Sequence, residues 1–167
     1  FVRGKLWTIQ LDATDKWEKL DRYMEQYGVR FCVIDALPNK HSAKKFALRH
    51  RAKVFIQYFS DAEFKIDKER AGESQVRKII VNRTESLDET TSFFQNDDIY
   101  IPAMKKLQGR ALKLIEEYRS HMKMLIKDLV EDSKGNMSYK YKRNVPNHFG
   151  MATNSARIAW EISSRLV

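Results

Sequence analysis

An apolar segment that ends in a single acid constrains the fold of this chain more than any other feature. Residues 31–36 read Phe-Cys-Val-Ile-Asp-Ala, and Pro38 follows two positions later. A run this apolar is typical of a strand covered on both faces, as in a parallel sheet between layers of helices. In open α/β sheets, ligands bind at the carboxyl ends of the strands, which is where Asp35 is expected to lie. Asp35 is therefore a candidate ligand-binding residue; the alternative is that its side chain caps the following turn or helix.

The segments on either side of this strand alternate between helical and extended patterns. Helices are predicted at about 15–27, 40–49, 86–94, 104–130 and 146–162. Strands are predicted at 2–11, 30–36, 53–58, 78–82, 99–101 and 137–141, with a loop or loose hairpin at 60–77. Capping boxes mark the helix starts at Asp15 and Ser86, where an acid follows three residues later. Strand, helix and strand joined by short connections predict a parallel pair with a right-handed crossover, and hence an α/β fold with a central sheet.

Composition limits the partners that suit the chain. Its 167 residues are enough for one domain with a real core. Lys and Arg number 31 against 22 Asp and Glu, a net charge of +9 that favours a polyanionic partner. The sequence holds no stretch approaching the ~18 apolar residues that a membrane span needs. The single cysteine, Cys32, lies in the apolar strand, which predicts a reduced and unreactive thiol.

Two groups of cations are candidate phosphate-binding surfaces, because backbone contacts drive sequence-independent DNA affinity. One group lies on the helix predicted at 40–49 and includes Lys40, Lys44 and Lys45. The other lies on or just after the strand predicted at 137–141 and consists of Lys140, Lys142 and Arg143. A basic helix face that is merely solvated is the alternative for the first group. Arg83 is a further candidate, which either bridges phosphates or pairs with Asp88.

Four stretches, taken in order along the chain, resemble a known family of nucleases. They are residues 33–38 with the helix that follows, 82–88 (Asn-Arg-Thr-Glu-Ser-Leu-Asp), 99–102 (Ile-Tyr-Ile-Pro) and 147–156 (Asn-His-Phe-Gly-Met-Ala-Thr-Asn-Ser-Ala). Together they resemble the C-terminal nuclease domain of the large terminase subunit of tailed phages. The resemblance runs from about Gly4 to Ile162 and implies a single domain with a ribonuclease H-like fold. That fold has a central mixed sheet flanked by helices, and its opening strand is expected to be absent from this chain.

The resemblance also implies an activity and a set of partners. The implied activity is metal-dependent cleavage of concatemeric double-stranded DNA during genome packaging in the host cytoplasm. Two divalent ions, Mg²⁺ or Mn²⁺, would stabilise the attacking water and the leaving oxygen of the phosphodiester. The implied partners are an ATPase domain upstream of Phe1, the small terminase subunit and the portal protein, with no membrane involved.

The chain departs from the family at two of the three acids that bind the metal ions. Asp35 matches the second acid, whereas the first ends the opening strand that this chain is expected to lack. The third lies directly before His148 or three residues after it, where this sequence has Asn147 and Met151. Asn147 can still offer a carbonyl oxygen to a metal. The resemblance therefore implies Asp35, Asn147 and His148 as catalytic residues and Asp35 and Asn147 as metal ligands; His148 alternatively caps or packs at the helix start.

Two other functions remain open from the sequence. The first is a catalytically silent module with the same fold that binds DNA or the portal, which the missing acids favour. The second is an unrelated basic α/β module, such as a resolvase or another ribonuclease H-like nuclease. In that case acids from other elements would converge on Asp35, and Asp88, Asp97 and Asp98 are available.

Overall fold

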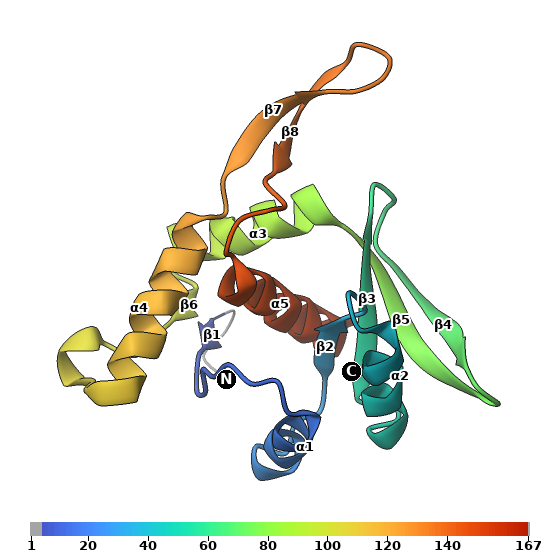
Figure 1. Cartoon of the computed structure of the whole chain (residues 1–167), viewed down its shortest axis with the longest axis vertical. Helices are drawn as coiled ribbons and strands as arrows, with labels where there is room; N and C mark the ends of the chain where they lie inside the picture. The colour runs from blue at the N-terminus through green and yellow to red at the C-terminus, as the bar shows by residue number, and fades with distance from the viewer. Residues whose placement is uncertain (1–4, 167) are drawn as a thin grey trace. The chain divides into compact units, whose positions relative to one another are not determined.

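The chain is a mixed α/β protein, with five α-helices in the part that its computed structural model describes, residues 5–166 (Figure 1). The predicted strand at 2–11 therefore lies partly outside the described residues. The chain divides into two compact units. Unit 1 comprises Thr84–Asn154 with the described residues up to Asp12, and unit 2 comprises Ala13–Arg83 with the residues from Ser155 onward.

Unit 2 is built on a four-stranded mixed sheet in the order β2–β3–β5–β4. Its strands are β2 (Cys32–Asp35), β3 (Val54–Ser60), β4 (Lys65–Ala71) and β5 (Ser74–Asn82). The first two and β5 run parallel, and β4 is antiparallel to β5. Helix α2 (Lys40–Arg49) connects β2 to β3, which confirms the predicted strand–helix–strand unit.

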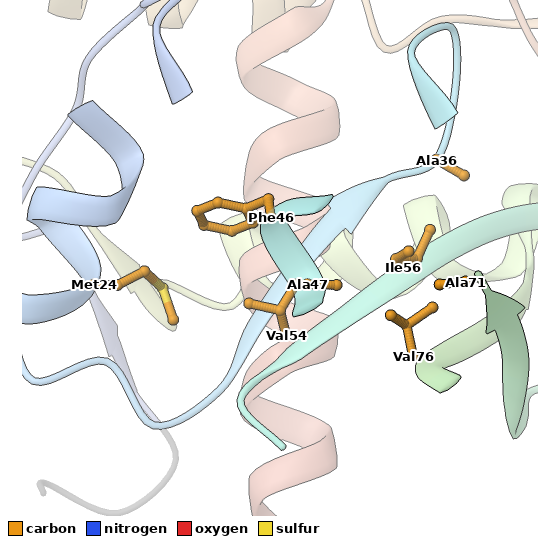
Figure 2. Close-up of a cluster of buried hydrophobic side chains, with 8 residues drawn as sticks. All are labelled: Met24, Ala36, Phe46, Ala47, Val54, Ile56, Ala71 and Val76. Atoms are coloured by element: carbon orange, nitrogen blue, oxygen red, sulfur yellow. The ribbon is translucent and has the colours of Figure 1, made fainter. Parts of the chain in front are cut away.

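One face of this sheet packs against two helices. Helix α1 (Trp17–Gln26) contributes Met24, and α2 contributes Phe46, to a buried cluster (Figure 2). Val54 and Ile56 of β3 complete the centre of this cluster. Because successive side chains of a strand point to opposite faces, the residues between them face the other way.

The opposite face packs against α5 (His148–Leu166). Ile158 and Ile162 of this helix, both fully buried, contact Phe55 of β3 and Ile79 of β5. Helices thus cover both faces of the sheet in unit 2, and the predicted central mixed sheet flanked by helices is confirmed there. Ser155, the first residue of α5 in unit 2, donates a hydrogen bond to Gln57, the register partner of the last residue of β2.

Unit 1 is mainly helical, with two small two-stranded sheets in its described residues. The helices are α3 (Arg83–Gln95), which starts one residue before the unit boundary, α4 (Gly109–Lys123) and the first part of α5. Strands β1 (Leu6–Trp7) and β6 (Ile99–Tyr100) pair in parallel, and β7 (Lys127–Glu131) and β8 (Met137–Tyr141) form an antiparallel hairpin. The buried apolar side chains of this unit are Leu87, Ile115, Tyr118, Tyr141 and Phe149.

The long helix predicted at 104–130 is wrong in its extent. A 3₁₀ turn, Met104–Lys106, precedes α4, which ends at Lys123. Apolar residues continue at helical spacing as far as Leu129, but residues 127–131 pair with β8 instead. Pairing with the next strand overrides the helical spacing here, because tertiary context outweighs local propensity.

Both predicted capping boxes are also wrong. Helix α1 begins after Lys16 without a side-chain cap, so Asp15 does not cap it. Helix α3 begins at Arg83, which leaves Ser86 inside the helix, where its Oγ accepts a hydrogen bond from Nδ2 of Asn154. A buried tertiary partner therefore determines the role of Ser86.

The segment predicted as a loop or loose hairpin at 60–77 forms a regular hairpin. Strands β4 and β5 pair from Lys65 opposite Ile80 to Ala71 opposite Ser74. Gly72 in the turn has a φ of +62°, a value that glycine adopts without strain. The β4 sequence, Lys-Ile-Asp-Lys-Glu-Arg-Ala, is mostly charged because β4 is an edge strand with a solvated face.

Candidate functional site around Asp35

Asp35 is the last residue of β2 and is the register partner of Gln57 in β3, a strand that continues to Ser60. Its Oδ1 accepts a hydrogen bond of 3.0 Å from the backbone N–H of Leu37. The alternative role foreseen for Asp35, capping the following turn, is therefore confirmed. This contact leaves Oδ2 without a hydrogen-bonding side chain among residues 5–166, so the carboxylate still has capacity for a ligand.

The surroundings of Asp35 change the pKa of its carboxyl group. Partial burial raises the pKa of its carboxyl group above the ordinary value, although the backbone N–H groups of Leu37 and Ala36 and the positive charge of Arg83 act in the opposite direction. The residue nevertheless has an exposed side that solvent reaches. A carboxylate that burial disfavours gains most from a cation placed beside it.

Strand β3 places Gln57 directly beside Asp35. The two residues are register partners in the parallel pair, and the backbone N–H of Ala36 donates to the carbonyl oxygen of Gln57 at 3.0 Å. Both side chains lie on the α5 face of the sheet, because Asp35 is two residues after Val33 and Gln57 two after Phe55. Gln57 is completely buried; its Oε1 accepts from Oγ of Ser155 at 3.0 Å, and its Nε2 has no partner in the described part of the chain.

Sequence reasoning missed Gln57, although a signal was present. The strand Val54-Phe-Ile-Gln-Tyr58 is apolar except for this amide. A polar side chain inside an apolar strand is normally hydrogen-bonded or functional.

Arg83 directly follows β5, and its positive charge acts on Asp35. Its positive charge lowers the pKa of the Asp35 carboxyl group, so it lies on the Asp35 side of unit 2. In unit 1, the Asp88 carboxylate accepts a hydrogen bond from Tyr141 (2.8 Å) and pairs with Lys127 (2.6 Å). Bridging of phosphates by Arg83 stays a prediction.

Asn147 and His148 belong to unit 1, whereas Asp35 belongs to unit 2. Asn147 is buried and directly precedes α5; its carbonyl accepts from the N–H of Met151, and its Nδ2 has no partner within residues 5–166. His148 is exposed, and its ring meets that of His121 edge-on with centroids 5.6 Å apart. Their joint action with Asp35 at one metal site stays a prediction.

The first group of cations is largely engaged by an acid of β4. Lys40 and Lys44 approach Oε1 of Glu69 at 2.8 and 2.7 Å, and the Tyr58 hydroxyl donates to Oε2 at 2.7 Å. Lys45 is exposed and has no hydrogen-bond or ion-pair partner among the described residues. Of these three lysines, Lys45 therefore has the charge most available to a phosphate.

The contacts of Glu69 make a testable contribution to stability. Partial burial alone would raise the pKa of its carboxyl group, but hydrogen bonds from Lys40, Lys44 and Tyr58 outweigh it and lower the pKa from 4.5 to about 2. A pKa below the unfolded value gives stabilisation that is complete above pH 4.5 and is lost as the pH falls toward 2. Glu69→Gln should therefore lower the free energy of unfolding at neutral pH, by ~1 kcal/mol or less for a group this solvated.

Urea unfolding of both proteins between neutral and acidic pH checks this expectation. The difference in midpoint between wild type and Glu69→Gln should narrow as the pH falls below 4.5. Glu63→Gln is a matched control, because Glu63 is exposed and has no partner within the described chain. If the difference in midpoint widens in acid, the ionised Glu69 carboxylate does not stabilise the fold through Lys40, Lys44 and Tyr58.

The second group of cations lies on the β7–β8 hairpin, which projects from the end of α4 (Figure 1). Lys140 and Arg143 are exposed, and Lys142 pairs with Asp128 of the opposite strand at 3.3 Å. Tyr139, also on β8, is 62% exposed. The hairpin thus presents cations and an aromatic ring to solvent.

Metal binding at Asp35 stays a prediction. No group of three His, Cys, Asp or Glu side chains within residues 5–166 is arranged to hold a metal ion. Mg²⁺ commonly binds one or two carboxylates and completes its shell with waters and substrate phosphates. Asp35 fits an ion held in that way, with phosphate oxygens completing the shell.

Cys32 behaves as the sequence predicted. Burial raises the pKa of its thiol to about 12, so the thiol stays protonated at neutral pH. Since the thiolate is the reactive form, Cys32 is unsuited to act as a nucleophile.

Comparison with known proteins identifies no relative of this chain. No family model, no curated protein and no solved structure matches the chain. Within residues 5–166, none of the helices combines the length and the apolar character that crossing a bilayer requires.

Proposed function

We propose that this chain is a divalent-cation-dependent DNA endonuclease domain with a ribonuclease H-like fold, of the kind found in phage large terminases. The observation that carries the proposal is the position of Asp35. It is a solvent-exposed carboxylate with an open oxygen at the end of an apolar strand, next to a buried amide and near the positive charge of Arg83. Further support comes from the mixed sheet of unit 2, covered by helices on both faces, and from the four sequence stretches that resemble the terminase family.

The proposed chemistry divides the work between the metal and the side chains. Mg²⁺ or Mn²⁺ on Asp35 would supply Lewis-acid stabilisation of the phosphodiester and a more acidic bound water. Asp35 holds the ion and keeps it at the sheet edge. Arg83 would balance the charge of the bound phosphate.

DNA affinity in this proposal comes from the basic surface of the chain. A net charge of +9 favours double-stranded DNA, with an ATPase domain, a small terminase subunit and a portal protein as further proposed partners in the host cytoplasm. A two-stranded ribbon such as β7–β8 is narrow enough to enter the major groove of DNA. Its exposed cations, Lys140 and Arg143, are the proposed contacts, together with Lys45 and Arg83 of unit 2.

Replacing Lys140 and Arg143 together with glutamine should weaken DNA binding and reduce its dependence on salt. Each lost phosphate contact removes ~0.9 from the slope of log affinity against log salt concentration, so the slope should fall by up to ~2. Fluorescence anisotropy with a labelled duplex, measured over a salt series, gives this slope. Lys19→Gln with Arg22→Gln on α1 is the control, since it removes the same charge elsewhere. An unchanged slope in the hairpin variant would exclude these contacts.

The activity itself is tested by Mn²⁺-dependent nicking of supercoiled plasmid. Wild type and Asn147→Asp are compared, because the substitution restores the acid that the terminase family has before the histidine. Nicking by Asn147→Asp alone would support a nuclease site that lacks its third acid, and nicking by both would support an active wild-type enzyme.

A second candidate is a catalytically silent module with the same fold that binds DNA or the portal. The observation that favours it is Asn147, a neutral side chain where the family has an acid. This reading predicts salt-dependent DNA binding by both proteins and nicking by neither.

A further inference from the structure

The buried carboxamide of Gln57 is the least satisfied polar side chain beside Asp35. Gln57 is 0% exposed. Val33, Phe55 and Ile79 belong to the apolar cluster on the same face of the sheet. One half of the amide is held, since Oε1 accepts a hydrogen bond from Ser155. The other half, Nε2, has no acceptor among residues 5–166.

Such an arrangement is unfavourable for folding. A buried donor without a partner costs ~1–3 kcal/mol, and an apolar side chain of similar size would avoid that cost. Asn154 of unit 1 shows the usual solution for an equally buried amide: its Oδ1 accepts from Thr90 at 2.8 Å, and its Nδ2 donates to Ser86 at 3.2 Å. Gln57 lacks this second partner, which points to an acceptor that arrives with a ligand or with a change in Asp35.

The nearest candidate acceptor is the Asp35 carboxylate. Asp35 and Gln57 are register partners on the same face of parallel strands, which lie ~4.8 Å apart. The N–H of Leu37 occupies one lone pair of Oδ1, which leaves Oδ2 open. Side chains at such neighbouring positions on one face lie beside one another, which makes Oδ2 the nearest candidate acceptor for Nε2.

We propose that Gln57 is a positioning residue, whose Nε2 donates a hydrogen bond to Oδ2 of Asp35 and fixes that carboxylate for a divalent cation. The inference rests on the proposed function, because it takes Asp35 as a metal ligand. Carboxylates that bind metals are themselves held by hydrogen bonds, which orient their lone pairs toward the ion. The N–H of Leu37 already holds one side of the Asp35 carboxylate, and Gln57 would supply the second support.

The test combines stability with Mn²⁺ binding in the whole chain. The variant is Gln57→Met with Ser155→Ala. It removes both side chains of the Ser155–Gln57 hydrogen bond, so neither is left buried without its partner. Its urea midpoint is expected to equal or exceed that of wild type, whereas Asn154→Leu, which removes the hydrogen bonds of this amide with Thr90 and Ser86, is expected to lower the midpoint. A lower midpoint for the Gln57 variant would mean that the amide has an ordinary structural role, and would overturn the proposal.

Binding of Mn²⁺ alone, followed by the electron paramagnetic resonance signal of the free ion, gives the second readout. Loss of support from outside the ligand shell typically weakens metal affinity 10–100-fold, so the Gln57 variant should bind at least ~10-fold more weakly than wild type. Asp35→Asn is measured in parallel. If it loses Mn²⁺ while the Gln57 variant binds like wild type, the positioning role fails and the proposed function stands. If Asp35→Asn binds like wild type, Asp35 is no ligand, and both fail.

Discussion

Replacing Asp35 with asparagine is expected to lower the rate of Mn²⁺-dependent DNA nicking by ~100-fold or more in whichever protein nicks, wild type or Asn147→Asp. The loss of a charged ligand removes several kcal/mol of stabilisation, and each 1.36 kcal/mol corresponds to about a tenfold change in rate. The turn itself should survive, because an asparagine Oδ1 can accept the same hydrogen bond from Leu37. Initial rates of plasmid nicking, with circular dichroism as the check on folding, measure the effect.

Asp67→Asn is the matched control for this substitution. Asp67 lies on β4 of the same unit, where its carboxylate accepts from the N–H of Lys68 at 2.8 Å and approaches the lysines at 65 and 78. It has no part in the proposed site, so its variant should nick DNA at the rate of its parent. A folded Asp35→Asn protein that nicks as fast as its parent would disprove the assignment of Asp35.

Phe46→Ala is expected to cause a large loss of stability. Phe46 is 1% exposed and lies between α2 and the sheet of unit 2, with its ring centroid 5.5 Å from Trp17 and 4.9 Å from His50 (Figure 2). Truncation of a buried phenylalanine costs ~3–5 kcal/mol, because apolar contacts are lost and a cavity remains. Chemical denaturation followed by circular dichroism gives the change in the free energy of unfolding.

Leu37→Ala provides the comparison for Phe46. Leu37 is 63% exposed, so its truncation removes little buried surface and should change stability by less than ~0.5 kcal/mol. Similar losses in the two variants would show that Phe46 is not part of a packed core.

Much of unit 2 could be predicted from the sequence because its elements carry local signals. The strand that ends at Asp35 and the helix Lys40–Arg49 follow from an apolar run, a proline and helical spacing. Strand β4 gives no such signal, since its charged side chains suit an edge strand only in the presence of β5. Strand β7 was predicted as helix because its apolar residues continue the helical spacing of α4, although it pairs with β8 in a hairpin.

The candidate site was predicted only in part. Asp35 could be found because an acid at the end of an apolar strand is informative by itself. Gln57 could not be assigned a role, since its meaning depends on register with Asp35 and on a missing hydrogen-bond partner, which are properties of the folded chain. The ion pairs of Lys40 and Lys44 with Glu69 were equally inaccessible, because the acid lies on a strand that the sequence pattern did not reveal.

The packing of Trp17 against Phe46 also gives unit 2 an intrinsic optical reporter. When unit 2 unfolds, the Trp17 indole leaves its apolar surroundings for water, and its emission should shift to longer wavelength. Trp7, in unit 1, is already 62% exposed and stacks on Tyr100, so its emission should change less. The change in fluorescence therefore reports mainly the unfolding of unit 2. Comparing the fluorescence transition with the circular dichroism transition would show whether the two units unfold in one cooperative step.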